Sequence, residues 1–241
     1  MRRRIALVAL LSASLLAPTA SGHVVAGQRC ATEQRLGDAE LAYAASARAT
    51  VKAFAAPGGR FVRTFARQNQ NGVRTVFGVL ASVTDASCQS AWYRVQLPMR
   101  PNGATGFVRA DDVNLFAVRS RVEVDLSSRR VFVFRRGMLV LTASAGVGVG
   151  GTPTPTGRYY VNQRFRILNP SGPFGPAAIG VSAFSPTLTD WAQGGPIAIH
   201  GTSDPSSVGR AASHGCIRVQ NDVARRLLRL VGTGSPVVIH A

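Results

Sequence analysis

The feature that most constrains the fold is a series of short β-like runs separated by turn residues. Between residues 50 and 118, runs such as RTVFGVLASV and WYRVQLP alternate with the turn clusters PGG, NG and PNG. Evenly spaced short strands with glycine and proline between them are typical of small barrels and sandwiches. We therefore predict a small β domain at 50–118, and we expect residues 27–49 to form a linker with a short helical segment.

Residues 119–241 predict a second, mostly β domain. RVEVDL and RVFVF flank an SS turn and alternate in polarity, which favours a β-meander, and GRYYVNQRFRIL, GPIAIHG and SPVVIHA add further strands. One helix is predicted where Asn221 can cap an amphipathic run that ends at Gly232. The expected fold class is mainly β, with one or two short helices.

The first 26 residues have the pattern of a secretory signal peptide. Three arginines at positions 2–4 precede an apolar run from Ile5 to Ala17, and small residues offer cleavage after Gly22 or after Ala26. A bilayer span needs about 20 apolar residues, which neither this run nor any later segment provides. We expect an extracytoplasmic protein of the periplasm or cell wall, with a retained N-terminal anchor as the alternative.

The charge of the chain points to anionic partners. The formal net charge is +17, and Lys52 is the only lysine, so nearly all of the positive charge is arginine. Such a charge favours association with polyanions. The arginines are dispersed along the chain and the chain carries an export signal, so we expect anionic cell-wall polymers rather than nucleic acid.

The three cysteines divide into a pair and a single residue. Cys30 and Cys88 lie in the first half of the chain, and Cys216 stands far downstream. Cysteines of exported proteins tend to pair, and an odd one suggests a reactive thiol. We expect a disulfide between Cys30 and Cys88 and a free Cys216.

The stretch ASHGCIRV around Cys216 favours nucleophilic chemistry. A free cysteine is commonly a buried apolar residue, but here His214 and His200 are both candidate bases for the thiol. Arg218 is expected to lower the thiol pKa. The amides of Gly215 and Cys216 are candidate donors to an oxyanion. His200, at a predicted strand end, is the stiffer platform for a base, and His214 is the alternative.

Three other patterns have simpler explanations. His200, His214, Cys216 and His240 lack the paired spacing of a zinc site, so no metal is expected. The glycines of GVGVGG are followed by TPTPTG rather than by a helix, which excludes a dinucleotide site, and no cofactor is expected. Core or strand packing is the preferred interpretation of three aromatic residues that could also border a substrate groove, namely Tyr159, Tyr160 and Trp191.

Two motifs together resemble the signature of a known enzyme family. IAIHGT at 197–202 followed by SHGCIRV at 213–219 is similar to the L,D-transpeptidase catalytic domain, or YkuD domain. The upstream phrases VEVDLSSRRVFVFRRG, TPTPTGRYYV and GPFGPAAIG occur in the family's order, so the resemblance covers 119–241. The earlier segment WYRVQLPMRPNGATGFVRADDV resembles a bacterial SH3-like module, which would make 50–118 a small SH3-like β-barrel.

The resemblance implies a β-sandwich-like catalytic domain that acts on peptidoglycan through a cysteine acyl-enzyme. The donor would be a tetrapeptide stem that loses its terminal D-Ala. The acyl group would pass to an amine of a neighbouring stem, which gives a 3–3 cross-link, or to water. Two alternatives remain: a non-catalytic wall-binding protein, and a cysteine endopeptidase that cuts within the stem.

The family's residue roles transfer to matching positions of this chain. Cys216 corresponds to the nucleophile and His200 to the proton acceptor, with the Gly201 carbonyl orienting the imidazole. Three residues correspond to the loop that shapes the oxyanion site, namely Ser213, His214 and Gly215. Arg218 corresponds to a position that often holds Arg or Asn in the family.

Overall fold

The computed structural model of the chain describes residues 30–241. The predicted signal peptide at 1–26 lies outside the described residues. Within them, no helix is both long enough and apolar enough to cross a membrane.

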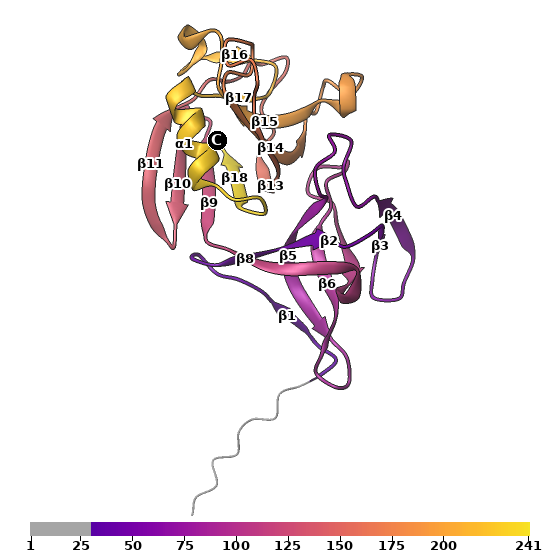
Figure 1. The fold of residues 1–241 in the computed structure, drawn as a ribbon. Helices are drawn as coiled ribbons and strands as arrows, with labels where there is room; N and C mark the ends of the chain where they lie inside the picture. The colour runs from indigo at the N-terminus through magenta and orange to yellow at the C-terminus, as the bar shows by residue number, and fades with distance from the viewer. Residues whose placement is uncertain (1–29) are drawn as a thin grey trace, which may run out of the picture.

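An antiparallel sheet forms the N-terminal domain (Figure 1). Its strands follow the order β4-β3-β7-β6-β5-β2-β8, and β1 pairs with β5. The core contains Val51, Phe77, Val95 and Val108, all fully buried. The strands are β1 (Glu33–Arg35), β2 (Ala42–Ala47), β3 (Val51–Phe54), β4 (Phe61–Phe65), β5 (Val76–Thr84), β6 (Ser90–Gln96), β7 (Thr105–Arg109) and β8 (Val113–Val118), with a 3-10 turn η1 (Ala110–Asp112) before β8.

The expected linker with a short helical segment at 27–49 is wrong in its described part. The strands β1 and β2 lie there and belong to the sheet. The run AYAASA in β2 is rich in alanine, which favours helix in isolation. In the fold β2 lies between β5 and β8, where Ala45 pairs with both Phe77 and Leu115 and is fully buried. The small side chains fit a crowded central strand, and this pairing outweighs local propensity.

The second domain is built on a sheet that runs β11-β10-β9-β18-β13-β14-β15-β17. It begins directly after the first, since β8 ends at Val118 and β9 starts at Ser120. The strands are β9 (Ser120–Asp125), β10 (Arg130–Arg135), β11 (Met138–Ser144), β13 (Gly157–Arg166), β14 (Ala177–Phe184), β15 (Pro196–His200), β17 (Ile217–Arg218) and β18 (Pro236–His240), beside a small pair of β12 (Val147–Gly148) and β16 (Ala211–Ser213).

Strand β13 joins two halves of this sheet. Its first part, from Gly157 to Tyr160, pairs with β18, and the part from Val161 to Arg166 pairs with β14. The register shifts between Val161 and Gln163, where the β13–β14 pairing is irregular. Such an irregularity, a β-bulge, bends a strand and increases its twist.

The prediction of a mainly β fold is confirmed.

The helix α1 (Asn221–Leu230) covers the sheet with one apolar face, with Ala224 and Leu227 buried against β14. The expectation that Asn221 caps this helix is wrong. Gln220 is the N-cap residue and makes no side-chain cap bond. The Asn221 side chain instead accepts a hydrogen bond from the Thr202 amide at 2.8 Å, because the helix start packs beside the loop after β15.

Hydrogen bonds connect the two domains, one of them buried. The Tyr160 hydroxyl donates to the Val76 carbonyl at 2.9 Å, and its ring is 1% exposed. The Gln96 side-chain amide donates to the Arg158 carbonyl at 2.9 Å. Tyr159 is also buried, so both tyrosines pack inside the protein, which agrees with the preferred interpretation of the sequence.

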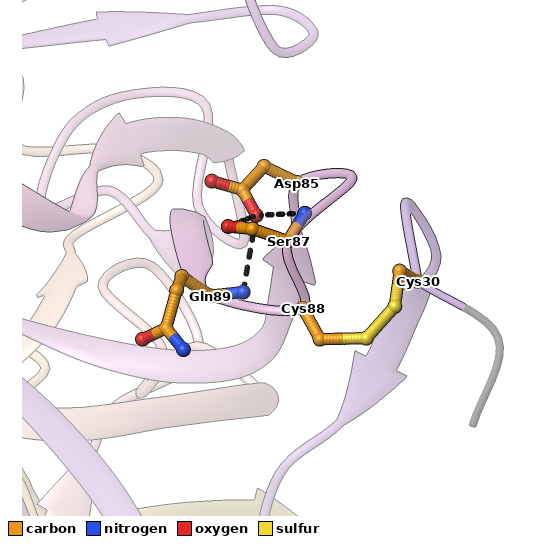
Figure 2. Close-up of a disulfide and its surroundings, with 5 residues drawn as sticks. All are labelled: Cys30, Asp85, Ser87, Cys88 and Gln89. Atoms are coloured by element: carbon orange, nitrogen blue, oxygen red, sulfur yellow. Dashed lines mark hydrogen bonds between the residues drawn. A yellow bond between two sulfur atoms is a disulfide. The ribbon is translucent and has the colours of Figure 1, made fainter.

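A disulfide ties the start of the described chain to the β5–β6 turn (Figure 2). Cys30 and Cys88 are bonded, with their Cα atoms 4.7 Å apart and a separation of 58 positions in the sequence. The turn that presents Cys88 is organised by Asp85, whose carboxylate accepts from the Ser87 amide at 2.9 Å and the Gln89 amide at 3.0 Å.

We predict that replacing both Cys30 and Cys88 with serine lowers the free energy of unfolding by about 4 kcal/mol, because the bond closes a long loop in the unfolded chain. Urea unfolding of the double variant checks the value. Thiol titration of the denatured, unreduced wild type should find one free thiol per chain. A count of three would contradict the bond.

Candidate active site

Cys216 lies in a tight loop between β16 and β17. Its thiol is free and half-buried. The Ser213 hydroxyl stabilises the loop, since it donates to the Cys216 carbonyl at 2.6 Å and accepts from the Gly215 amide at 3.2 Å. Gly215 has φ +111°, a conformation that other residues rarely adopt. The SHGC sequence therefore forms a self-bonded turn that requires its glycine.

The glycine-rich stretch after β11 supports this turn, a role that sequence reasoning missed. The Thr154 hydroxyl donates to the Gly215 carbonyl and accepts from the Gly148 amide, both at 2.9 Å. The Val149 amide donates to the Ser213 carbonyl at 3.0 Å. The two motifs are about 60 residues apart in sequence, and nothing local to TPTPT indicates this contact.

His200 is held at the end of β15 with one defined ring orientation. The ring is 4% exposed, and its Nδ1 lies 2.5 Å from the Gly201 carbonyl oxygen. A carbonyl only accepts, so Nδ1 carries the proton and Nε2 is left with a free lone pair. The ring of Phe174 packs edge-on against the His200 ring, with the two ring centroids 5.1 Å apart. This arrangement makes Nε2 a proton acceptor.

The parallel pairing of β15 with β17 places the histidine and the cysteine on one face. Ile199 pairs with Ile217, and both are buried in the core. Side chains alternate along strands, so Cys216, Arg218 and His200 project from the opposite face. His200 is directly opposite Arg218 and diagonal to Cys216, whose Sγ lies 3.9 Å from the Pro196 carbonyl oxygen.

The alternative base, His214, lies at the surface against Trp191. His214 is exposed, and its ring centroid lies 5.3 Å from that of Trp191. Trp191 is itself 53% exposed, so the pair forms part of the surface beside the nucleophile loop, and the preferred interpretation of Trp191 as a core or strand residue is wrong. His240 is exposed at the end of β18, with its Nδ1 3.1 Å from the carbonyl oxygen of Ala241. The structure thus gathers Ser213, Gly215 and Arg218 around Cys216 and His200, and His214 lies at the rim.

One of the two predicted oxyanion donors is already occupied. The Gly215 amide donates to Ser213 Oγ. That leaves the Cys216 amide as the donor next to the thiol.

No group of three or more His, Cys, Asp or Glu side chains within residues 30–241 could hold a metal ion.

Comparison with known proteins identifies the family of the chain. Residues 119–239 match the family model of the L,D-transpeptidase catalytic domain, YkuD. The chain belongs to the YkuD family. Two curated YkuD relatives come from Bacillus licheniformis, with 37% identity over 49% of this chain and 64% of the relative, and from Bacillus subtilis, with 32% over 52% and 68%. The chain spans about two thirds of the length of these relatives.

A solved structure of an L,D-transpeptidase from Mycobacterium smegmatis is also similar. It shares 21% identity and has a TM-score of 0.43, over 70% of this chain and 91% of that one.

Burial controls the protonation of both central residues in this YkuD domain. It lowers the pKa of His200 to about 4, although the bond to the Gly201 carbonyl acts in the opposite direction. Burial also raises the pKa of the Cys216 thiol, and the Ala198 amide and the Arg218 guanidinium offset this only in part. Arg218 does act as expected, but the expected net depression of the thiol pKa is wrong. At neutral pH both groups are uncharged.

A residue outside the YkuD motif, Asn221, supports the His200 loop. Its side-chain oxygen bonds the amide of Thr202, a residue that is 2% exposed. We predict that Asn221→Ala lowers the free energy of unfolding by about 1–3 kcal/mol, because it leaves a buried amide without an acceptor. Asn221→Asp keeps the acceptor and is the control. Thermal or urea unfolding measures both variants, and equal losses in the two would contradict the assignment.

The pKa of His200 predicts an unusual pH profile. Because the base must be unprotonated, acylation of Cys216 should stay near its neutral rate as pH falls below 6.5 and should drop only near pH 4. The acylation rate measured across this range checks the profile. An acid limb centred near 6.5 would contradict it.

The same pKa requires a folding control. The folded pKa lies below the 6.5 of a free imidazole, so the unfolded chain binds the proton more readily, and stability falls as pH decreases from 6.5 to 4. Circular dichroism at each pH therefore accompanies the rates and separates lost activity from lost structure.

Proposed function

We propose that the protein is a peptidoglycan L,D-transpeptidase with Cys216 as nucleophile and His200 as general base. The observation that carries the proposal is the parallel β15–β17 pairing, which puts the two side chains on one face with His200 Nε2 unprotonated. Membership of the YkuD family supports the same reaction class. The substrate is a tetrapeptide stem, as the family resemblance implies.

In the proposed reaction the Cys216 sulfur attacks the carbonyl carbon of the third stem residue. The thiol proton passes to His200 Nε2 as the S–C bond forms, and the Cys216 amide donates to the developing oxyanion. Collapse breaks the peptide bond, and His200 returns the proton to the departing D-Ala amine. The neutral ground state requires this transfer during attack, because the thiol is not ionised beforehand.

The thioester is then resolved by an acceptor. An amine of a neighbouring stem attacks its carbonyl and loses a proton to His200, and the thiolate that leaves recovers that proton. The product is a 3–3 cross-link, and water in place of the amine gives hydrolysis. The dispersed arginines and the net charge of +17 favour accumulation at the anionic wall polymer.

The remaining features fit an exported wall enzyme. We infer that residues 1–26 direct export to the periplasm or cell wall. The catalytic domain corresponds to 119–241, and the N-terminal β domain is an SH3-like module whose sheet begins at β1 rather than at residue 50.

Intact-protein mass spectrometry after incubation with a tetrapeptide stem or a carbapenem tests the proposal. We expect a covalent adduct on the wild type that is absent from Cys216→Ala. A folded, reduced wild type that gains no mass contradicts the proposal. Product analysis identifies the bond cleaved, because an endopeptidase would release a fragment larger than D-Ala.

We also predict that His200→Ala lowers the acylation rate by about 10²–10⁴-fold, the usual contribution of a general base. His214→Ala is the matched control, because its ring lies at the surface against Trp191. The rates come from the growth of the adduct peak with time. A larger loss in His214→Ala than in His200→Ala would reverse the two roles.

A further inference from the structure

The segment 185–195 joins β14 to β15 and borders the nucleophile. Its Trp191 ring lies against the His214 ring, beside Cys216 in sequence. The residue that follows the segment, Pro196, has its carbonyl oxygen 3.9 Å from Cys216 Sγ. The position of this segment therefore determines what a substrate meets next to the thiol.

One arginine of the N-terminal domain holds both ends of the segment. Nη2 of Arg100, in the β6–β7 connection, donates to the Ser185 carbonyl at 2.7 Å and to the Gly194 carbonyl at 2.8 Å. Its guanidinium also lies 5.4 Å from the centre of the Phe184 ring. Within the segment, the Ser185 amide bonds the Gly195 carbonyl at 2.8 Å. The Arg100 side chain and this main-chain bond together close the base of the loop.

Two further residues of the N-terminal domain reinforce this contact. Asn102 accepts from the Phe184 amide at 2.9 Å and donates to the Phe184 carbonyl at 2.8 Å, as a neighbouring strand would. Asn71, in the β4–β5 connection, exchanges hydrogen bonds of 2.8 and 3.3 Å with the side chain of Gln193. The N-terminal domain therefore contacts the segment at its start and near its end.

Several of these residues line a space between the domains. A cleft of about 430 Å³ is lined by residues of both domains, among them Arg100, Asn71, Gln193 and Pro196. A movement of the N-terminal domain would therefore shift the segment and the Pro196 carbonyl together.

We propose that the N-terminal domain positions the active site, with Arg100, Asn102 and Asn71 as positioning residues that hold segment 185–195 beside Cys216. The catalytic part of this inference rests on the proposed function. A loop held at both ends is ordered before substrate arrives, and correct placement of a peptide against the nucleophile depends on that order. On this view the domain contributes to the rate of acylation even if it binds no wall polymer.

The test compares Arg100→Ala, Arg100→Lys and the control Arg109→Ala. Arg109 lies in the same domain and stacks on Trp92 at 5.4 Å, the same distance as Arg100 on Phe184, so the control removes an equivalent charge and ring contact away from the segment. Asn102→Asp, which keeps the acceptor and removes the donor, is an independent variant. Each protein is tested for acylation by a tetrapeptide stem, alkylation of Cys216 by iodoacetamide, and hydrogen exchange of the 185–195 peptide.

We expect Arg100→Ala to acylate about 10- to 100-fold more slowly, since a small displacement of a substrate contact costs this much. Iodoacetamide needs no positioning, so its rate should stay near that of the wild type, and hydrogen exchange in 185–195 should accelerate. Arg100→Lys, which can donate to the same carbonyls, should recover part of the rate. Asn102→Asp should fall between Arg100→Ala and the wild type, and Arg109→Ala should match the wild type.

Other results overturn the inference. Acylation and exchange at the wild-type level in both Arg100→Ala and Asn102→Asp would show that the contacts do not position the segment. A parallel loss of acylation and alkylation with a lower Tm would show a purely structural role. A wild type that alkylates but is never acylated would overturn the proposed function as well, so the two failures are distinguishable.

Discussion

The parallel pairing of β15 with β17 is the interaction on which the site depends. Two short strands, separated along the chain by the segment that contains β16, meet with His200 opposite Arg218. Their inward side chains complete the core, and their outward side chains bring an imidazole and a thiol to one face. The packing that stabilises the domain is therefore the same packing that assembles the candidate nucleophile and base. The Thr154 and Ser213 hydroxyls, which donate to main-chain carbonyls, and the Asn221 side chain, which accepts from the Thr202 amide, hold the loops around them.

Burial keeps both Cys216 and His200 uncharged, whereas a thiolate–imidazolium pair carries two opposite charges. Desolvation disfavours charge on both groups, so it raises the pKa of Cys216 and lowers that of His200. In the proposed reaction, the neutral thiol of the resting protein becomes nucleophilic only as its proton moves to the imidazole. Arg218 lowers the pKa of the thiol, but its effect is smaller than that of burial.

The N-terminal domain is joined to the catalytic domain by contacts with distinct chemical roles. The buried Tyr160 hydroxyl bonds the Val76 carbonyl across the interface. Arg100 and Asn102 instead bond main-chain groups at the end of β14 and in the segment that follows. Hydrogen bonds to main-chain groups fix the path of a loop more directly than side-chain packing does, so this interface can influence the site without contacting substrate.

Much of the architecture could be predicted from local patterns. Alternating polarity located β9 and β10, further β-like runs located β13, β15 and β18, and the odd number of cysteines indicated that Cys216 is free. Local patterns failed where a distant partner decides the outcome. The alanine-rich run of β2 is a strand because β5 and β8 pair with it on both sides. Asn221 does not cap the helix because its side chain accepts a hydrogen bond from the Thr202 amide instead. The thiol pKa was predicted in the wrong direction because nearby sequence shows Arg218 but not the degree of burial.

By itself, the sequence determined a mainly β chain with a catalytic-type cysteine motif and a histidine on a strand end, since strand periodicity and motif spacing are local properties. Only the tertiary structure decided which histidine faces the thiol, which amide is left for an oxyanion and how the N-terminal domain holds segment 185–195. Those outcomes depend on strand register, burial and contacts between residues far apart in the chain, and none of these is encoded in a local pattern.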